Sequence, residues 1–149
     1  APSPCMAQLA SSCPAVATPF GTPCLGANGP MQPRVDALPW VGGALRATAA
    51  GFASSSLGLR VLGWQPSGLP LAQLHGAGTL GCNLLVQPDD VALLLPSAGE
   101  ATFATAIPNT PTLVGTTLFA QVLQVSLGPQ LQILALLGSD ARLLRIGIF

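Results

Sequence analysis

The stretch His75–Asp90 contains residues whose types and spacing are those of a cofactor site. Within it, residues 76–81 match the G-x-G-x-x-G pattern, in which backbone N–H groups bind the phosphates of a dinucleotide. Such a site needs a helix directly after the glycines, because the helix N-terminus holds the pyrophosphate. Residues 82–86 instead predict a strand that ends before Pro88. The glycines therefore predict a turn that leads into a strand.

His75 is the only histidine, so any catalytic centre with a histidine base would have to use it. No nucleophile turn of the G-x-S-x-G kind accompanies it, and we expect a turn or interface residue. Asp89 and Asp90 follow Pro88 and are oxygen donors of the kind that binds a hard cation. Adjacent aspartates are more typical of a turn, since their side chains bond to nearby backbone groups.

The remaining candidates for chemistry are acidic and aromatic side chains. Four acidic residues are candidates for a glycosidase pair: Asp89, Asp90, Glu100 and Asp140. Nothing in the sequence brings two of them together or indicates a raised pKa. Trp40 and Trp64 are candidates for a sugar-stacking platform, although a tryptophan in a β-sandwich is more often buried. We therefore predict that the chain is not an enzyme and uses no cofactor or metal.

Charged side chains are scarce throughout the chain. Five of the 149 residues are basic and five are acidic, the net charge is zero, and 50% of the residues are hydrophobic. An average globular protein has about 25% charged residues. Five scattered arginines form no basic stripe, which excludes a nucleic-acid partner. A surface with so few charges does little to suppress association, so we expect the chain to associate with itself.

Several features predict an exported protein. Proline or glycine interrupts every hydrophobic run, so no window of about 20 apolar residues is available for a membrane-spanning helix. We interpret the opening Ala1-Pro2-Ser3 as the start of a mature chain whose signal peptide has been removed. Four cysteines without a C-x-x-C pair, and a single histidine, favour disulfides over zinc. We expect an extracellular or cell-surface location.

The composition changes near residue 34. Residues 1–33 contain seven prolines and three of the four cysteines, which predicts an extended N-terminal arm pinned by disulfides. Residues 34–149 contain short apolar runs separated by turn residues, and they are long enough for one domain with its own core.

The apolar runs after the arm have the spacing of strands. Residues 45–49 and 57–61 alternate between apolar and other side chains, which predicts half-buried strands. Further strands are predicted at 82–87, 91–95, 100–107, 116–127 and 142–148, with a helical turn near 111–115 and either strand or turn at 130–137. About eight short strands predict an all-β fold, a two-sheet antiparallel β-sandwich, with a barrel as the alternative.

Six short motifs occur in a characteristic order: Cys24-Leu25-Gly26, Leu62-Gly63-Trp64, Leu69-Pro70-Leu71, residues 81–86, Ile107-Pro108-Asn109 and residues 118–121. Their order and spacing resemble a β-sandwich domain found at the C-terminal end of large secreted proteins of planctomycetes and related bacteria. The resemblance covers residues 21–149. It implies an extracellular, all-β module pinned by a disulfide, and it implies no activity.

Four cysteines allow three disulfide connectivities. Cys24 matches the early cysteine of the resembled family and Cys82 its Gly-Cys, so the resemblance implies a Cys24–Cys82 bond. That pairing leaves Cys5 with Cys13, and an intermolecular bond through one of these cysteines is the alternative.

Two functions are compatible with these features. The first is an extracellular structural subunit that polymerises head to tail into a filament, tube or sheath. The alternative is a binding or adhesion module that contacts a polysaccharide or another surface protein. Scarcity of charge favours the first. In a polymer, we expect neighbouring copies rather than the chain's own core to cover Leu62, Trp64, Leu143 and Leu144.

The N-terminal arm is predicted to contribute to assembly. Its prolines lack a backbone donor, so we do not expect it to add an interior strand to its own sheet. Its apolar side chains nevertheless need a surface to cover: Met6, Leu9, Val16 and Phe20. We predict that the segment before about residue 21 covers a sheet edge of a neighbouring copy.

Overall fold

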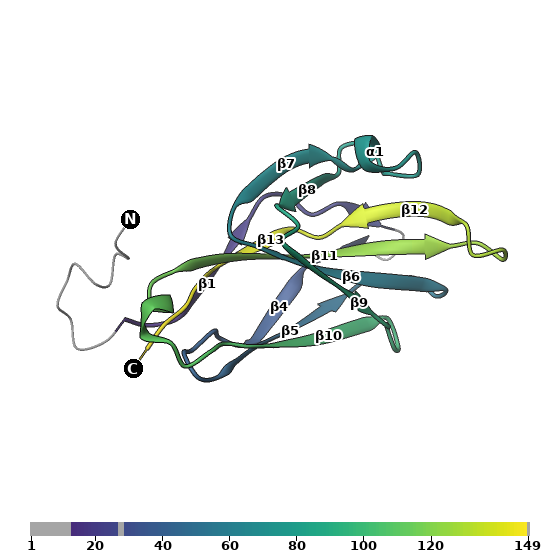
Figure 1. Ribbon diagram of the computed structural model, residues 1–149. Helices are drawn as coiled ribbons and strands as arrows, with labels where there is room; N and C mark the ends of the chain where they lie inside the picture. Colours follow the sequence, from purple (N-terminus) through teal and green to yellow (C-terminus); the bar gives the residue numbers. More distant parts are fainter. Residues whose placement is uncertain (1–12, 27–28, 149) are drawn as a thin grey trace.

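Strands dominate the computed structural model, which describes residues 13–26 and 29–148 (Figure 1). A central antiparallel sheet has the order β1 (Val16–Phe20), β13 (Ala141–Arg145), β11 (Thr117–Leu127), β6 (Ser56–Gly63) and β9 (Asp90–Leu94). Its sixth strand, β12 (Ile133–Gly138), pairs with the second half of β11. Among the described strands, β1 and β9 end the five-strand path, and β12 is a further outer strand beside β11.

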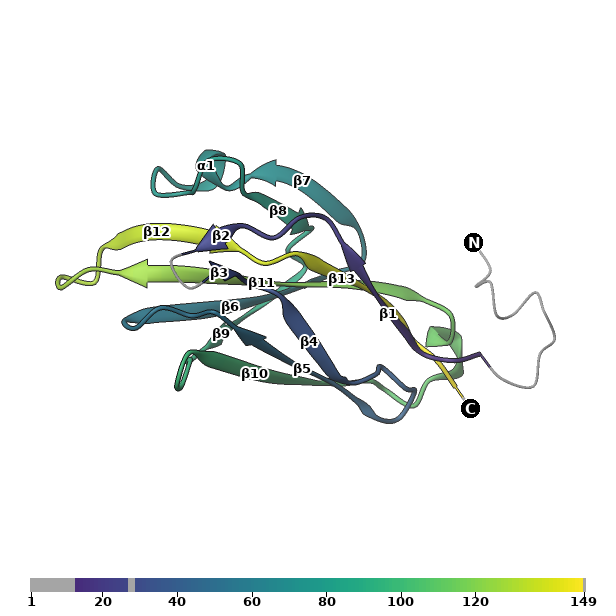
Figure 2. The same cartoon turned by 180° about the vertical axis from the view of Figure 1, so that it is seen from behind.

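Two smaller sheets cover the two faces of the central sheet. On one face lies a three-stranded sheet in the order β10 (Glu100–Ala106), β5 (Ala44–Ala50) and β4 (Pro33–Ala37). On the other face lie the pair β7 (Pro66–Pro70) and β8 (Asn83–Val86) and the short helix α1 (Leu71–Leu74). The two views show the central sheet between these layers (Figures 1 and 2). A short pair, β2 (Leu25–Gly26) and β3 (Gly29–Pro30), completes the described strands.

Strand β11 runs through the middle of the molecule because its side chains are apolar on both faces. Its even-numbered Leu118 and Val122 enter the core beneath the three-stranded sheet. Its odd-numbered Phe119, Leu123 and Val125 enter a second core beneath β7 and β8. The alternation of side chains along a strand thus gives this one element a share in both cores.

The predicted all-β antiparallel sandwich is confirmed, with more strands than the eight or so expected and a small third layer. The structure also differs from the prediction for residues 1–33. Strand β1 lies within that range and pairs with β13 of the same chain, from Val16 opposite Arg145 to Phe20 opposite Ala141. Pro19 fits this position because β1 is an edge strand, where a missing N–H donor is tolerated.

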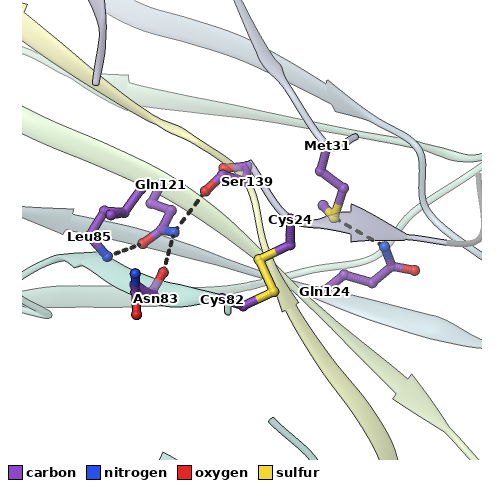
Figure 3. The surroundings of a disulfide bond; sticks show 8 residues. All are labelled: Cys24, Met31, Cys82, Asn83, Leu85, Gln121, Gln124 and Ser139. Carbon is purple, nitrogen blue, oxygen red and sulfur yellow. Dashed lines mark hydrogen bonds between the residues drawn. A yellow bond between two sulfur atoms is a disulfide. The ribbon is translucent and has the colours of Figure 1, made fainter. Parts of the chain in front are cut away.

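A disulfide joins Cys24 to Cys82, as predicted, with a Cα–Cα distance of 5.5 Å and a sequence separation of 58 (Figure 3). Both cysteines are buried. The bond ties the residue before β2 to the residue before β8, so it anchors the β7–β8 layer. Cys13 is also disulfide-bonded, whereas Cys5, its predicted partner, lies outside the described residues.

Within residues 13–26 and 29–148, no helix has both the length and the apolar character needed to cross a membrane.

Candidate functional site

The glycine motif forms a turn, as predicted. Helix α1 precedes residues 76–81, and strand β8 follows them. A Cβ atom on Gly78 would lie 2.3 Å from the backbone of Leu71, so the turn packs tightly against the helix before it. His75 belongs to the same turn, where its Nδ1 accepts a hydrogen bond of 3.0 Å from the N–H of Ala77. These contacts give both the glycines and the histidine a local structural role.

Of the four acidic candidates, Asp89 and Asp90 are adjacent in the chain, and Asp90, Glu100 and Asp140 lie in separate surroundings. Asp140 is buried and forms a 2.6 Å ion pair with Arg142. Asp90 pairs with Arg60, and Glu100 begins β10 at an exposed position. Across the part of the chain that the structure describes, no three His, Cys, Asp or Glu side chains gather in a way that would hold a metal ion.

An open cleft of about 190 Å³ lies between the central sheet and the three-stranded sheet. It occupies the end of the sandwich where β11 begins and β10 ends. Its walls are mainly apolar, and they are formed by Leu62, Gly63, Trp64, Asp89, Asp90, Thr105, Ala106, Ile107, Pro108, Leu113, Leu118 and Ile146. The cleft therefore combines an aromatic side chain with two carboxylates.

Trp64 and Asp89 are fixed beside each other at this cleft. The backbone N–H of Trp64 donates to Oδ2 of Asp89 over 2.9 Å, and the N–H of Asp89 donates to the carbonyl of Leu62 over 3.1 Å. Gly63 permits this approach, because a Cβ atom there would lie 1.9 Å from the carbonyl oxygen of Gln87. The Trp64 side chain remains 51% exposed.

Asp90 differs from Asp89 because it has a cationic partner. Its carboxylate accepts a hydrogen bond from Arg60, whose other terminal nitrogen donates to Oγ1 of Thr105 over 3.2 Å. Arg60 therefore connects β6 and β9 to β10 beside the cleft. Because Arg60 neutralises Asp90, the remaining charge at the cleft is the negative charge of Asp89.

The outer edge of β9 is a second exposed feature. Strand β9 ends the central sheet and pairs only with β6 among the described strands. Leu94 points into the core beneath the three-stranded sheet, whereas Val91, Leu93 and Leu95 are 49%, 59% and 74% exposed. Successive strand residues alternate between faces, so Val91 and Leu93 lie on the face that β7 and β8 cover only in part, and Leu95 continues this exposed row directly after the strand.

The structure overturns two of the predicted interface positions. Leu62 and Leu144 are 5% and 0% exposed and belong to the core beneath the three-stranded sheet. They are buried within their own subunit because the central sheet is covered on both faces. Leu143 is half-buried and packs against the other core. Trp64 alone of the four is exposed.

The predicted arm residues also divide between two groups. Val16 and Phe20 lie in β1 and pair with the chain's own β13, which corrects the expectation that they cover a neighbour. The ring of Phe20 packs edge-on against Phe119, with the ring centroids 5.6 Å apart. Met6 and Leu9 lie outside the described residues.

The sequence did not predict the role of two buried glutamines in β11. Gln121 accepts a hydrogen bond from the N–H of Leu85 and donates to the carbonyls of Asn83 and Ser139 (Figure 3). Gln124 accepts from the N–H of Ala53 and donates to the sulfur of Met31 and the carbonyl of Gly51. The sequence feature that could have predicted these bonds is the presence of two glutamines in an otherwise mainly apolar strand. A buried polar side chain requires hydrogen-bond partners.

The chain matches none of the family models, curated proteins or solved structures with which it was compared.

Proposed function

We propose that this protein is an extracellular structural subunit that assembles with copies of itself into a filament, tube or sheath. The observation that carries the proposal is the outer edge of β9, which pairs with no second strand among the described residues. An edge strand presents unpaired backbone groups that template pairing with another chain, and proteins usually protect it with lysine, proline or a covering segment. Residues 90–94 contain no lysine or proline, and the charge of Asp90 is paired with Arg60.

Composition supports the same proposal. With zero net charge and ten charged side chains in total, the molecule has little repulsion to oppose association. The exposed row of Val91, Leu93 and Leu95 offers apolar area that a contact would remove from water. A buried disulfide is compatible with an oxidising location outside the cell.

The proposed partner of β9 is the N-terminal segment of a second copy. Residues 16–20 pair with their own β13, so the proposed contact concerns the residues before them, which include Met6 and Leu9. Cys13 bridges Ile148 beyond β1, whereas β9 forms the opposite edge of the sheet. A contact between two different surfaces repeats from copy to copy, so it forms an open polymer.

Substituting one residue in the exposed row tests the assembly. Leu93→Lys places a charge on the β9 edge and should abolish ordered polymers while leaving the fold intact, because the side chain is 59% exposed. Leu80→Lys is the matched control, since Leu80 is 88% exposed in the glycine turn, which contacts β12 rather than β9. Negative-stain electron microscopy and light scattering would measure assembly, and circular dichroism would check folding. Equal assembly of both variants and the unaltered protein would refute the proposal.

A truncation separates the two halves of the contact. Deleting residues 1–12, together with Cys13→Ser to avoid an unpaired thiol, should also give a folded protein that does not polymerise. If this variant assembles normally while Leu93→Lys does not, β9 is an assembly surface but the N-terminal segment is not its partner.

A further inference from the structure

We infer that the cleft beside Trp64 binds one ring of a neutral, hydroxyl-rich polysaccharide. The cleft and the β9 row use different residues. The inference therefore stands independently of the proposed assembly.

The aromatic side chain provides the first part of the argument. Trp64 is the only aromatic residue among the large hydrophobic side chains that are exposed in residues 13–26 and 29–148. The cleft also exposes Pro108 and Leu113 along its wall. A half-exposed indole offers a flat apolar face together with an N–H donor, and a sugar ring offers the matching combination of C–H groups and hydroxyls.

The carboxylate of Asp89 supplies the polar part of the site. Its Oδ2 accepts the backbone hydrogen bond from Trp64, whereas its Oδ1 accepts none from the described residues. An ionised carboxylate only accepts hydrogen bonds, so the ligand has to bring donors. Sugar hydroxyls meet this requirement, and their bonds to a charged acceptor are stronger than bonds between neutral groups.

The charge and the volume of the cleft indicate which class of sugar it would bind. Arg60 neutralises Asp90, which leaves the negative charge of Asp89 at the cleft. A uronic acid or a sulfated sugar would meet like charge there, so the geometry favours an uncharged ring. A volume of about 190 Å³ is small beside the roughly 300–1,000 Å³ of a drug-sized pocket. The cleft therefore fits a single ring, and its opening to solvent allows the polysaccharide chain to continue outward.

Hydrogen bonds within the chain hold part of the site in place before any ligand arrives. The bond from the Trp64 N–H to the Asp89 carboxylate and the bond from the Asp89 N–H to the Leu62 carbonyl fix the Trp64 backbone and the acceptor together. Gly63 permits the close crossing beneath them. Preorganisation of this kind reduces the entropy lost on binding.

Tryptophan fluorescence provides a direct test, because the chain has only two tryptophans. In a Trp40→Phe background, adding hydroxyethyl cellulose, galactomannan or arabinoxylan should change the emission of Trp64 with at least one of these probes. Polygalacturonate, an anionic polymer, should bind at least about tenfold more weakly, a factor that corresponds to one like-charge penalty of about 1.4 kcal/mol.

Calorimetry with the neutral polysaccharide that binds would then compare variants. Trp64→Ala should lower the affinity about tenfold or more, whereas the exposed control Leu80→Ala should leave it unchanged. Asp89→Asn keeps an oxygen acceptor for Trp64 but removes the charge, so it should reduce the discrimination against polygalacturonate.

Three results would overturn the inference: no neutral polysaccharide binds, polygalacturonate binds equally well, or Trp64→Ala binds as the unaltered protein does. If Trp64→Ala instead prevents assembly and no polysaccharide binds, the cleft is a contact between copies and the inference is wrong.

Discussion

The two faces of the central sheet are covered in different ways. The three-stranded sheet β10-β5-β4 covers one face with a core that includes Leu45, Phe103 and Leu144. Among the described residues, the opposite face carries the smaller pair β7–β8 and one helical turn, over a core that includes Leu84 and Phe119. The first layer is wide enough to bury Leu94 of β9, whereas the second leaves the other side of β9 exposed.

The narrower layer compensates for its size with specific bonds. The Cys24–Cys82 disulfide anchors it covalently. Gln121 bonds to the backbone of Asn83 and Leu85, so its side chain takes the place of a neighbouring strand along β8. Hydrophobic burial scales with covered area, so a small layer gains less from burial and depends more on such bonds. The same narrowness leaves the β9 row available for assembly.

The largest effect is expected from removing the bond that anchors the narrow layer. The double variant Cys24→Ala/Cys82→Ala should lower the free energy of unfolding by about 4 kcal/mol, because a loop of 58 residues is released in the unfolded chain. Urea denaturation followed by circular dichroism measures this change. Hydrogen exchange should show faster opening of β7 and β8 than of β5 and β10. Equal acceleration in both layers would contradict the assignment of this bond to one face.

A smaller loss of stability is expected from replacing either of the two buried glutamines. The difference between the two losses tests whether the narrow layer depends more on side-chain bonds than the wide layer does. Gln121→Leu leaves three backbone groups, of Leu85, Asn83 and Ser139, without their hydrogen-bond partner, and two of these groups are in β8. The variant should lower the free energy of unfolding by about 3 kcal/mol. Gln124→Leu should cost only about 1 to 2 kcal/mol. Its partners Gly51 and Ala53 are partly exposed and can bond to water instead.

Chemical denaturation of both variants, each against the unaltered protein, gives the two values. A larger loss for Gln124→Leu than for Gln121→Leu would mean that the narrow layer does not depend on its side-chain bond.

The sequence predicted the strands in which apolar and polar side chains alternate or in which the apolar run is long. The predicted strands at 45–49, 57–61, 82–87, 91–95, 100–107 and 116–127 correspond to β5, β6, β8, β9, β10 and β11, and the helical turn near 111–115 is present as a 3-10 turn at Pro111–Leu113. Periodicity identifies these elements because each has one buried face, or two in the case of β6 and β11. Strands β1, β4 and β7 were not predicted as strands, because each contains proline, which argues against a strand in a sequence.

The site required tertiary information that no local pattern carries. Leu62 was expected at an interface because alternation assigned it to the face opposite Val61, but both faces of β6 are covered. Trp64 and Asp89 lie 25 positions apart and meet only because β6 and β9 are neighbours. Pairing between strands distant in sequence determines such contacts, so the cleft was not predicted even though its aromatic residue was singled out.

The smallest expected effect is a loss of stability at low pH. It should involve the three-stranded layer alone. Hydrogen bonds from Arg34 and Thr48 hold the pKa of Asp36, in β4, below its usual value of 3.8. A lowered pKa in the folded state stabilises the protein above the unfolded value, and this stabilisation is lost as the pH falls through the folded pKa. Residues 66–86 of the narrow layer contain no acidic side chain, so they have no counterpart to this effect.

Asp36→Asn should therefore lower the melting temperature by about 2 °C at pH 6, a small change because Arg34 is largely exposed and the pair is screened by solvent. At a pH below the folded pKa of Asp36, the variant and the unaltered protein should melt together. Arg34→Gln removes the largest cause of the shift and should reproduce most of the loss at pH 6. Calorimetric scans between pH 2 and pH 6 measure these differences. A loss that is the same at both ends of this range would show that Asp36 acts through packing rather than through its charge.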